Sequence, residues 1–175
     1  MCVMRWLPLP GNSGWPVRRS LPLALTLAVL VTLAACARPP LPIRLAGLHR
    51  NRVWTGTRAA SMIGELHGKQ VAPRSSMVAD YGTGGELRVF LSTYADETQA
   101  YRVLERMLSG MGSGNTPFAT PRQEPGGTGR WLTFGPGGHH LLWVSKGTVY
   151  WLQGLPDAVQ GAAAELPRPS AGTWT

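Results

Sequence analysis

The chain has 175 residues, and its 17 Lys and Arg outnumber its nine Asp and Glu, which gives a net charge of +8 at pH 7. This length fits one domain with a modest core. The basic residues are spread along the sequence and form no stripe, so we expect no nucleic-acid partner. Both cysteines, Cys2 and Cys36, lie near the N-terminus, which leaves the rest of the chain without a thiol for a disulfide, a metal site or a nucleophile.

The first 36 residues have the layout of an export signal. Arg18 and Arg19 precede an uncharged apolar run that starts at Leu21 and ends at Ala35, directly before Cys36. The run is 15 residues long, shorter than the ~20 that a membrane-spanning helix needs, so the pattern predicts a removable signal. The long segment before the arginine pair leaves Met1 and Met4 as alternative starts.

Residues 1–36 resemble bacterial lipoprotein precursors, in which small residues precede a lipidated cysteine. The resemblance implies cleavage between Ala35 and Cys36, lipid on the Cys36 thiol, and a protein anchored in a membrane of the cell envelope and facing the periplasm. Ala37, in place of Asp, favours the outer membrane where the host has one. Three basic residues precede Cys36 and all nine acidic residues follow it, so the mature charge is +5, which favours a position near anionic lipid headgroups.

The sequence after Cys36 predicts a tether followed by one domain. Ala37–Leu45 contains three prolines and no periodic apolar pattern, so we expect an extended spacer. The predicted organisation is a signal peptide over 1–35, a lipidated N-terminus and Pro-rich tether over 36–56, a single domain over 57–166 and a flexible tail over 167–175.

Two helices are predicted in the first half of the domain. Thr57 is a suitable N-cap for a helix over 58–67, in which apolar residues recur at helical spacing. A helix over 97–111 has the stronger pattern, because Asp96 and Gln99 resemble a capping box and apolar residues then recur at every third or fourth position. Its apolar face predicts packing against a sheet.

Five strands are predicted from short apolar runs separated by glycine-rich turns. They span 77–81, 86–92, 131–134, 139–145 and 148–153. An irregular loop is predicted over 110–129, and an alanine-rich stretch over 157–166 predicts a short final helix. The expected fold class is α+β: an antiparallel sheet of about five strands packed against one main amphipathic helix, with short helices before and after.

Aromatic residues concentrate on the last three predicted strands. They are Trp131, Trp143, Tyr150 and Trp151. Two alternatives follow from this concentration. The rings either pack in the core, which is what most aromatic side chains do, or form an exposed platform for a hydrophobic ligand, a glycan or a partner.

Three histidines, His67, His139 and His140, are candidate binding residues. Adjacent residues on a strand point to opposite faces, so regular strand geometry keeps His139 and His140 from chelating one metal ion. A site that adds His67 lacks a recognisable third ligand, and no metal, haem or hydrolase motif is present. We therefore predict no metal site, no cofactor and no catalytic residue, and hence a protein that is not an enzyme.

The predicted function is that of a membrane-anchored envelope lipoprotein with a non-catalytic binding or accessory role, held by Cys36 and contacting an envelope protein. The alternative is a small-ligand, metal or haem-binding accessory protein with a pocket between helix and sheet. The order of hairpin, helix and meander over 57–154 resembles small exported domains of unknown function, which implies no activity. The sequence sets no oligomeric state.

Overall fold

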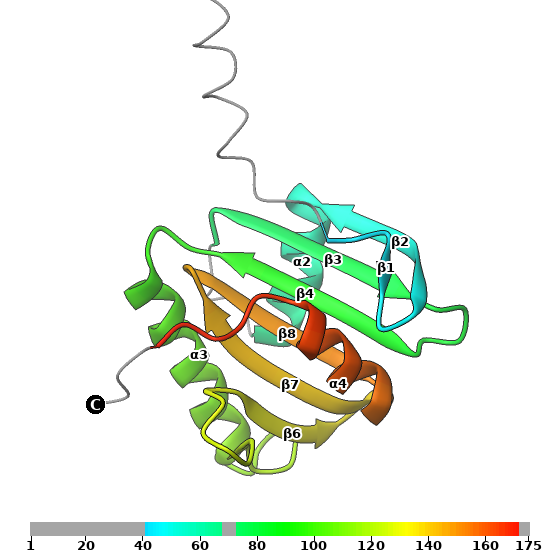
Figure 1. Ribbon diagram of the computed structural model, residues 1–175. Helices are drawn as coiled ribbons and strands as arrows, with labels where there is room; N and C mark the ends of the chain where they lie inside the picture. Colours follow the sequence, from blue (N-terminus) through cyan, green and yellow to red (C-terminus); the bar gives the residue numbers. More distant parts are fainter. Residues whose placement is uncertain (1–40, 68–72, 172–175) are drawn as a thin grey trace, which may run out of the picture. The chain divides into compact units, whose positions relative to one another are not determined.

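The computed structural model describes residues 41–67 and 73–171, which belong to one compact unit, Pro40–Thr175. These residues form an antiparallel sheet with helices on both of its faces (Figure 1). The elements in chain order are β1 (Arg44–Leu45), β2 (Leu48–Thr55), α2 (Gly56–His67), β3 (Ser75–Tyr81), β4 (Leu87–Thr93), α3 (Glu97–Gly112), β5 (Arg122–Gln123), β6 (Trp131–Gly135), β7 (Gly138–Ser145), β8 (Thr148–Gly154) and α4 (Pro156–Glu165).

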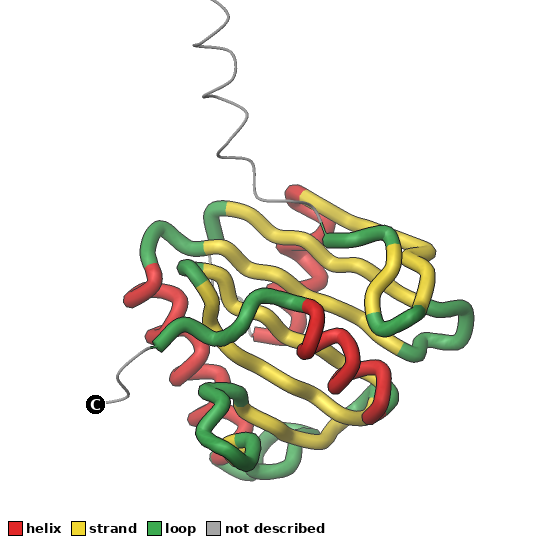
Figure 2. Tube along the Cα trace, viewed as in Figure 1, coloured by secondary structure: helices red, strands yellow, loops and turns green. Residues whose placement is uncertain are grey.

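The last strand in sequence, β8, lies in the interior of the sheet (Figure 2). The strand order is β1-β2-β3-β4-β8-β7-β6-β5. On one side of β8, Leu87 of β4 is opposite Gly154, and on the other side His139 of β7 is opposite the same glycine. β8 therefore joins the half of the sheet made by β1–β4 to the half made by β5–β7.

Each face of the sheet has its own hydrophobic core. On the first face, which we call the α4 face, the strands pack against α4 and against Leu41 and Leu166. On the second face, which we call the α3 face, they pack against α2 and α3. Figure 1 shows α4 in front of the sheet and α2 and α3 behind it. The sheet is thus the middle one of three layers.

The residues of β8 show how the sequence supplies both cores. Tyr150 and Leu152 lie on the α4 face, and Val149 and Trp151 lie on the α3 face, as the alternation of side chains along a strand requires. All four side chains are buried. A strand that is buried on both faces has a continuous apolar run instead of alternating apolar and polar residues.

The start of α3 follows the predicted capping pattern. The Asp96 side chain accepts a hydrogen bond from the Gln99 N–H at 2.7 Å, and the Gln99 side chain accepts one from the Ala95 N–H at 3.2 Å. These bonds satisfy N–H groups at a helix end, where the backbone offers no acceptor. The buried residues of α3 are Ala100, Val103, Leu104 and Met111. The predicted helix, its cap and its buried face are confirmed.

The prediction of about five strands against one main helix is wrong. The described residues form eight strands and three helices, and the sheet is covered on both faces, within the same α+β class. The additional strands are β1, β2 and β5. β2 has the sequence LHRNRVWT, in which exposed and half-buried polar residues hide the strand pattern. β1 and β2 lie in residues assigned to the tether, so the sheet begins before residue 57.

The two cores are built from residues between Leu41 and Leu166. A unit with its own core folds independently of the sequence that precedes it. A chain spanning 37–175 is therefore suitable for the measurements proposed below. Of the helices in the described ranges, none is long and apolar enough to cross a membrane.

Candidate functional site

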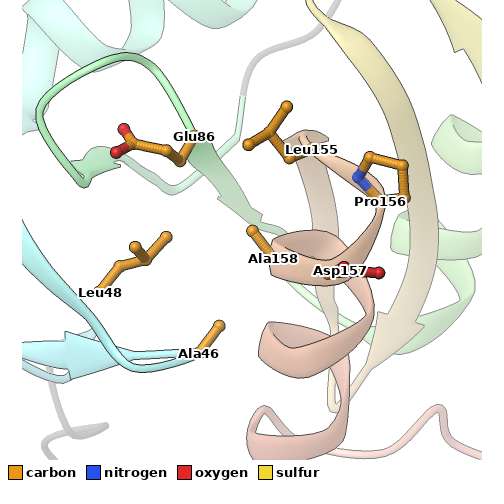
Figure 3. A pocket seen from close by; sticks show the side chains of 7 residues that line it. All are labelled: Ala46, Leu48, Glu86, Leu155, Pro156, Asp157 and Ala158. Atoms are coloured by element: carbon orange, nitrogen blue, oxygen red, sulfur yellow. The ribbon is translucent and has the colours of Figure 1, made fainter.

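A hollow of about 490 Å³ lies beside the N-terminal end of α4 (Figure 3). Its lining residues are Ala46, Leu48, Glu86, Leu155, Pro156, Asp157 and Ala158. They come from the β1–β2 turn, the β3–β4 turn and the start of α4. Leu155 is 57% exposed, which is unusual for a large apolar side chain in this molecule. Concave, mostly apolar surface with a few polar groups is the usual form of a binding site.

Backbone hydrogen bonds hold the three segments around the hollow. The Leu155 N–H donates to the Glu86 carbonyl oxygen at 2.9 Å, which joins α4 to the β3–β4 turn. The Ala46 N–H donates to Glu165 Oε1 at 3.0 Å, which joins the β1–β2 turn to the end of α4. Ala46 and Gly47 have φ values of 52° and 73°, as a two-residue turn between antiparallel strands requires. The hollow therefore has a defined shape.

Two carboxylates, Glu86 and Asp157, border the hollow. Hydrogen bonds from the backbone of Glu86 itself, and then of Gly84, lower the pKa of Glu86, so its carboxylate is charged at neutral pH. Asp157 lies in the first turn of α4, where the helix dipole favours a negative charge. The two side chains point in different directions (Figure 3), so they do not form an acid–base pair. An apolar surface with a negative border suits an apolar group flanked by basic groups.

The aromatic residues singled out in the sequence lie in the cores. Trp143, Tyr150 and Trp151 are only 0%, 9% and 2% exposed. Trp131, on β6, is half-buried and packs against the core of the α3 face. An aromatic platform requires exposed rings, whereas these rings contribute to packing on both faces of the sheet.

Trp143 is buried on the α4 face below the segment that follows α4. Its indole N–H donates to the Pro167 carbonyl oxygen at 2.9 Å, and its ring stacks on Tyr150 with 5.0 Å between centroids. The Arg130 guanidinium lies 5.3 Å from the centroid of the Trp143 ring and donates to the Ala163 carbonyl oxygen at 2.6 Å. Trp143 therefore connects the sheet, the loop before β6 and the C-terminal segment.

His140 is buried on the α3 face, and both of its ring nitrogens are hydrogen-bonded. Nδ1 accepts from the indole N–H of Trp151 at 2.9 Å, so Nε2 carries the proton and donates to the Pro136 carbonyl oxygen at 3.0 Å. The Phe118 ring packs edge-on against the His140 ring at 5.1 Å between centroids. Burial lowers the pKa of His140, and the hydrogen bond to Pro136 opposes this shift only in part. The neutral ring is a structural part of the core.

We expect the free energy of unfolding to decrease when the pH falls from about 7.5 to about 5.5. The unfolded chain protonates His140 near its ordinary pKa of 6.5, whereas the folded chain protonates it only at lower pH. Below the ordinary pKa the unfolded state therefore binds more protons and is favoured. Urea denaturation of the 37–175 chain at several pH values measures the effect.

The matched variants for this measurement are His140→Gln and His139→Gln. His140→Gln removes the titrating group and should reduce the dependence of stability on pH in this range. His139→Gln should retain most of the dependence, because burial is the main cause of the lowered pKa of His140 and the charge of His139 is the last of its causes. Equal pH dependence in the parent chain and His140→Gln would contradict the assignment.

The histidines do not come together in the described structure. His139 lies on the opposite side of β7 from His140, with its ring 4.4 Å from the Phe134 ring between centroids, as the strand alternation predicts. His67 is the last residue of α2, and its side chain lies outside the described part of the chain. Over the described ranges, no group of three His, Cys, Asp or Glu is placed to hold a metal ion.

The cleavage site predicted between Ala35 and Cys36, and lipidation of Cys36, fall outside the described residues. The hollow was not predicted from the sequence. Its one local signal is the run Leu155-Pro156-Asp157, in which proline and an acid mark a helix start. Nothing in the sequence pattern indicates that this run meets Ala46 and Glu86. The chain matches no protein-family model, no curated protein and no solved structure.

Proposed function

We propose that the protein is a lipid-anchored protein of the bacterial cell envelope with a non-catalytic binding or accessory role. The sequence Leu33-Ala34-Ala35-Cys36, placed after an arginine pair and an apolar run, carries this proposal. Cys36 is the only cysteine after the signal, so anchoring is the one role that the sequence suggests for its thiol. Ala37 favours the outer membrane as the destination where the host has one.

The short distance between Cys36 and the domain supports a role close to the membrane. Only four residues separate Cys36 from Leu41, the first residue of the α4-face core. Even fully extended, this segment reaches only ~17 Å. The hollow beside α4, with exposed Leu155 and two carboxylates, is the surface that we assign to contact with an envelope partner.

We expect Cys36→Ser to abolish incorporation of a fatty-acid analogue and to release the protein from the membrane fraction. Serine has no thiol for the thioether bond, and two or more acyl chains are what hold such a protein stably at a bilayer. The measurement is metabolic labelling followed by fractionation of the expressing cells.

Cys2→Ser is the matched control, because it makes the same substitution in the segment assigned to the signal peptide. This variant should be labelled and retained like the parent protein. Labelling of Cys36→Ser at the parent level would contradict lipidation at Cys36.

A further inference from the structure

The positive charge of the mature chain is concentrated in its N-terminal part. Residues 36–79 contain seven Lys and Arg and one acid, Glu65, whereas residues 80–175 contain seven Lys and Arg and eight acids. The net charge of the first part is therefore +6, and that of the second part is −1. Such an asymmetry indicates interaction with a polyanion or an anionic membrane.

The structure places four of these arginines along one edge of the sheet. β1 and β2 form the edge, α2 continues from β2, and β3 is the next strand inward (Figure 1). Four exposed arginines lie on these elements or directly before β3, and we call them the basic edge: Arg44, Arg52, Arg58 and Arg74. They have few acids nearby in the sequence, and the ion pairs of the described residues involve other arginines, Arg88 and Arg130.

The acid opposite Arg52 is already neutralised. Asp80 of β3 is the cross-strand partner of Arg52. Both carboxylate oxygens of Asp80 accept hydrogen bonds from Arg88, one of them at 2.9 Å from Nη2. Arg52 is therefore left to interact with groups outside the domain.

Apolar side chains are exposed on the same edge. Ile43 is 62% exposed next to β1, and Val53 of β2 is 46% exposed. Trp54 is half-buried, with the guanidinium carbons of Arg58 and Arg88 each 5.9 Å from its ring centroid. Basic residues with exposed apolar residues among them are typical of surfaces that lie in the headgroup region of a bilayer.

We propose that the basic edge binds the anionic phospholipid headgroups of the bilayer that holds the Cys36 anchor. This inference rests on the proposed function, because the anchor brings the edge to the membrane. The segment between Cys36 and Leu41 is only ~17 Å long when extended, so the edge stays close to the charged surface at all times. The domain then lies with the arginines of the basic edge toward the bilayer.

The test uses the 37–175 chain, which carries neither the signal nor Cys36. Its binding to phosphatidylcholine vesicles with and without phosphatidylglycerol is measured by sedimentation at low and high salt. We expect binding that requires phosphatidylglycerol and weakens as salt increases, because screening shortens the reach of the charges.

Two quadruple variants separate the basic edge from net charge. The first variant changes Arg44, Arg52, Arg58 and Arg74 to Gln. It should lower the vesicle partition coefficient at least about tenfold, since each basic residue near an anionic surface contributes about fivefold. The control changes Arg102, Arg106, Arg122 and Arg168 to Gln, which removes the same charge from exposed positions elsewhere. The control should bind within about twofold of the parent. Circular dichroism checks that both variants are folded.

The proposal would be overturned if vesicle binding did not depend on phosphatidylglycerol, or if the two quadruple variants lost equal amounts of binding. It would also be overturned if the parent chain bound short double-stranded DNA as strongly as the vesicles, because that result would identify a general polyanion surface. The outcome is independent of the lipidation assay. If Cys36 is labelled but the 37–175 chain does not bind the vesicles, only the proposal for the basic edge fails. If the chain binds the vesicles but Cys36 is not labelled, only the proposal for the anchor fails.

Discussion

Trp143→Ala should lower the free energy of unfolding by about 4 kcal/mol, a large part of the 5–15 kcal/mol that typically stabilises a domain. The side chain is completely buried, so the substitution leaves a large cavity in the α4-face core. It also removes the stack on Tyr150 and leaves the Pro167 carbonyl oxygen without the indole N–H. Urea denaturation of the 37–175 chain, followed by circular dichroism, measures the loss.

Trp143→Phe is the control for this prediction. It keeps an aromatic ring over Tyr150 and removes the hydrogen bond to Pro167, so we expect a loss of about 1–2 kcal/mol. A loss below about 2 kcal/mol for Trp143→Ala would show that the core refills the site, and that Trp143 does not hold the C-terminal segment on the sheet.

Gly154→Ala should destabilise the domain by about 3 kcal/mol. Gly154 has a φ of 152°, which side chains rarely allow, and it is paired on both sides of β8. A Cβ at this position would lie 2.1 Å from the Glu86 carbonyl oxygen and 3.0 Å from the Leu87 Cα. The backbone of β4 or β8 would have to move, which disrupts the interior of the sheet. The same denaturation experiment measures the effect.

Gly64→Ala makes the same substitution where the structure allows it. A Cβ at Gly64 meets nothing within 4 Å, and the residue lies inside α2. Alanine in place of glycine within a helix should raise the free energy of unfolding by about 0.5–1 kcal/mol. Opposite signs for the two variants are expected. A stabilising Gly154→Ala would contradict the close approach of β8 to the β3–β4 turn.

Local sequence patterns were sufficient to predict the elements that bury a continuous apolar face. The Asp96 cap and the apolar spacing of α3 identified that helix, and the runs of apolar residues identified β3, β4, β6, β7 and β8. β2 was missed because it lies at the edge and buries few of its side chains. Its pairing with β3, such as Trp54 opposite Val78, depends on residues far away in the sequence. The final helix was predicted over 157–166, but its position on the second face of the sheet was missed, because α4 is short, rich in alanine and only weakly amphipathic.

In the candidate sites, too, the features set by local geometry were predicted, and those that depend on distant residues were not. Alternation along β7 correctly separated His139 from His140, since it depends only on strand geometry. The hydrogen bond between His140 and Trp151 could not be predicted, because it depends on the register of β7 against β8. The hollow was also missed, since it joins residues near positions 46, 86 and 155 that share no motif.

The interior position of β8 also determines when the molecule can fold. Synthesis delivers a chain from its N-terminus, so β1–β4 become available long before residues 148–154. Until those residues arrive, the inner edge of β4 has no partner, and Trp143 lacks the Pro167 carbonyl oxygen above it. Contacts between segments so far apart form slowly. The strand order therefore keeps the sheet from being completed until almost all of the chain has been synthesised.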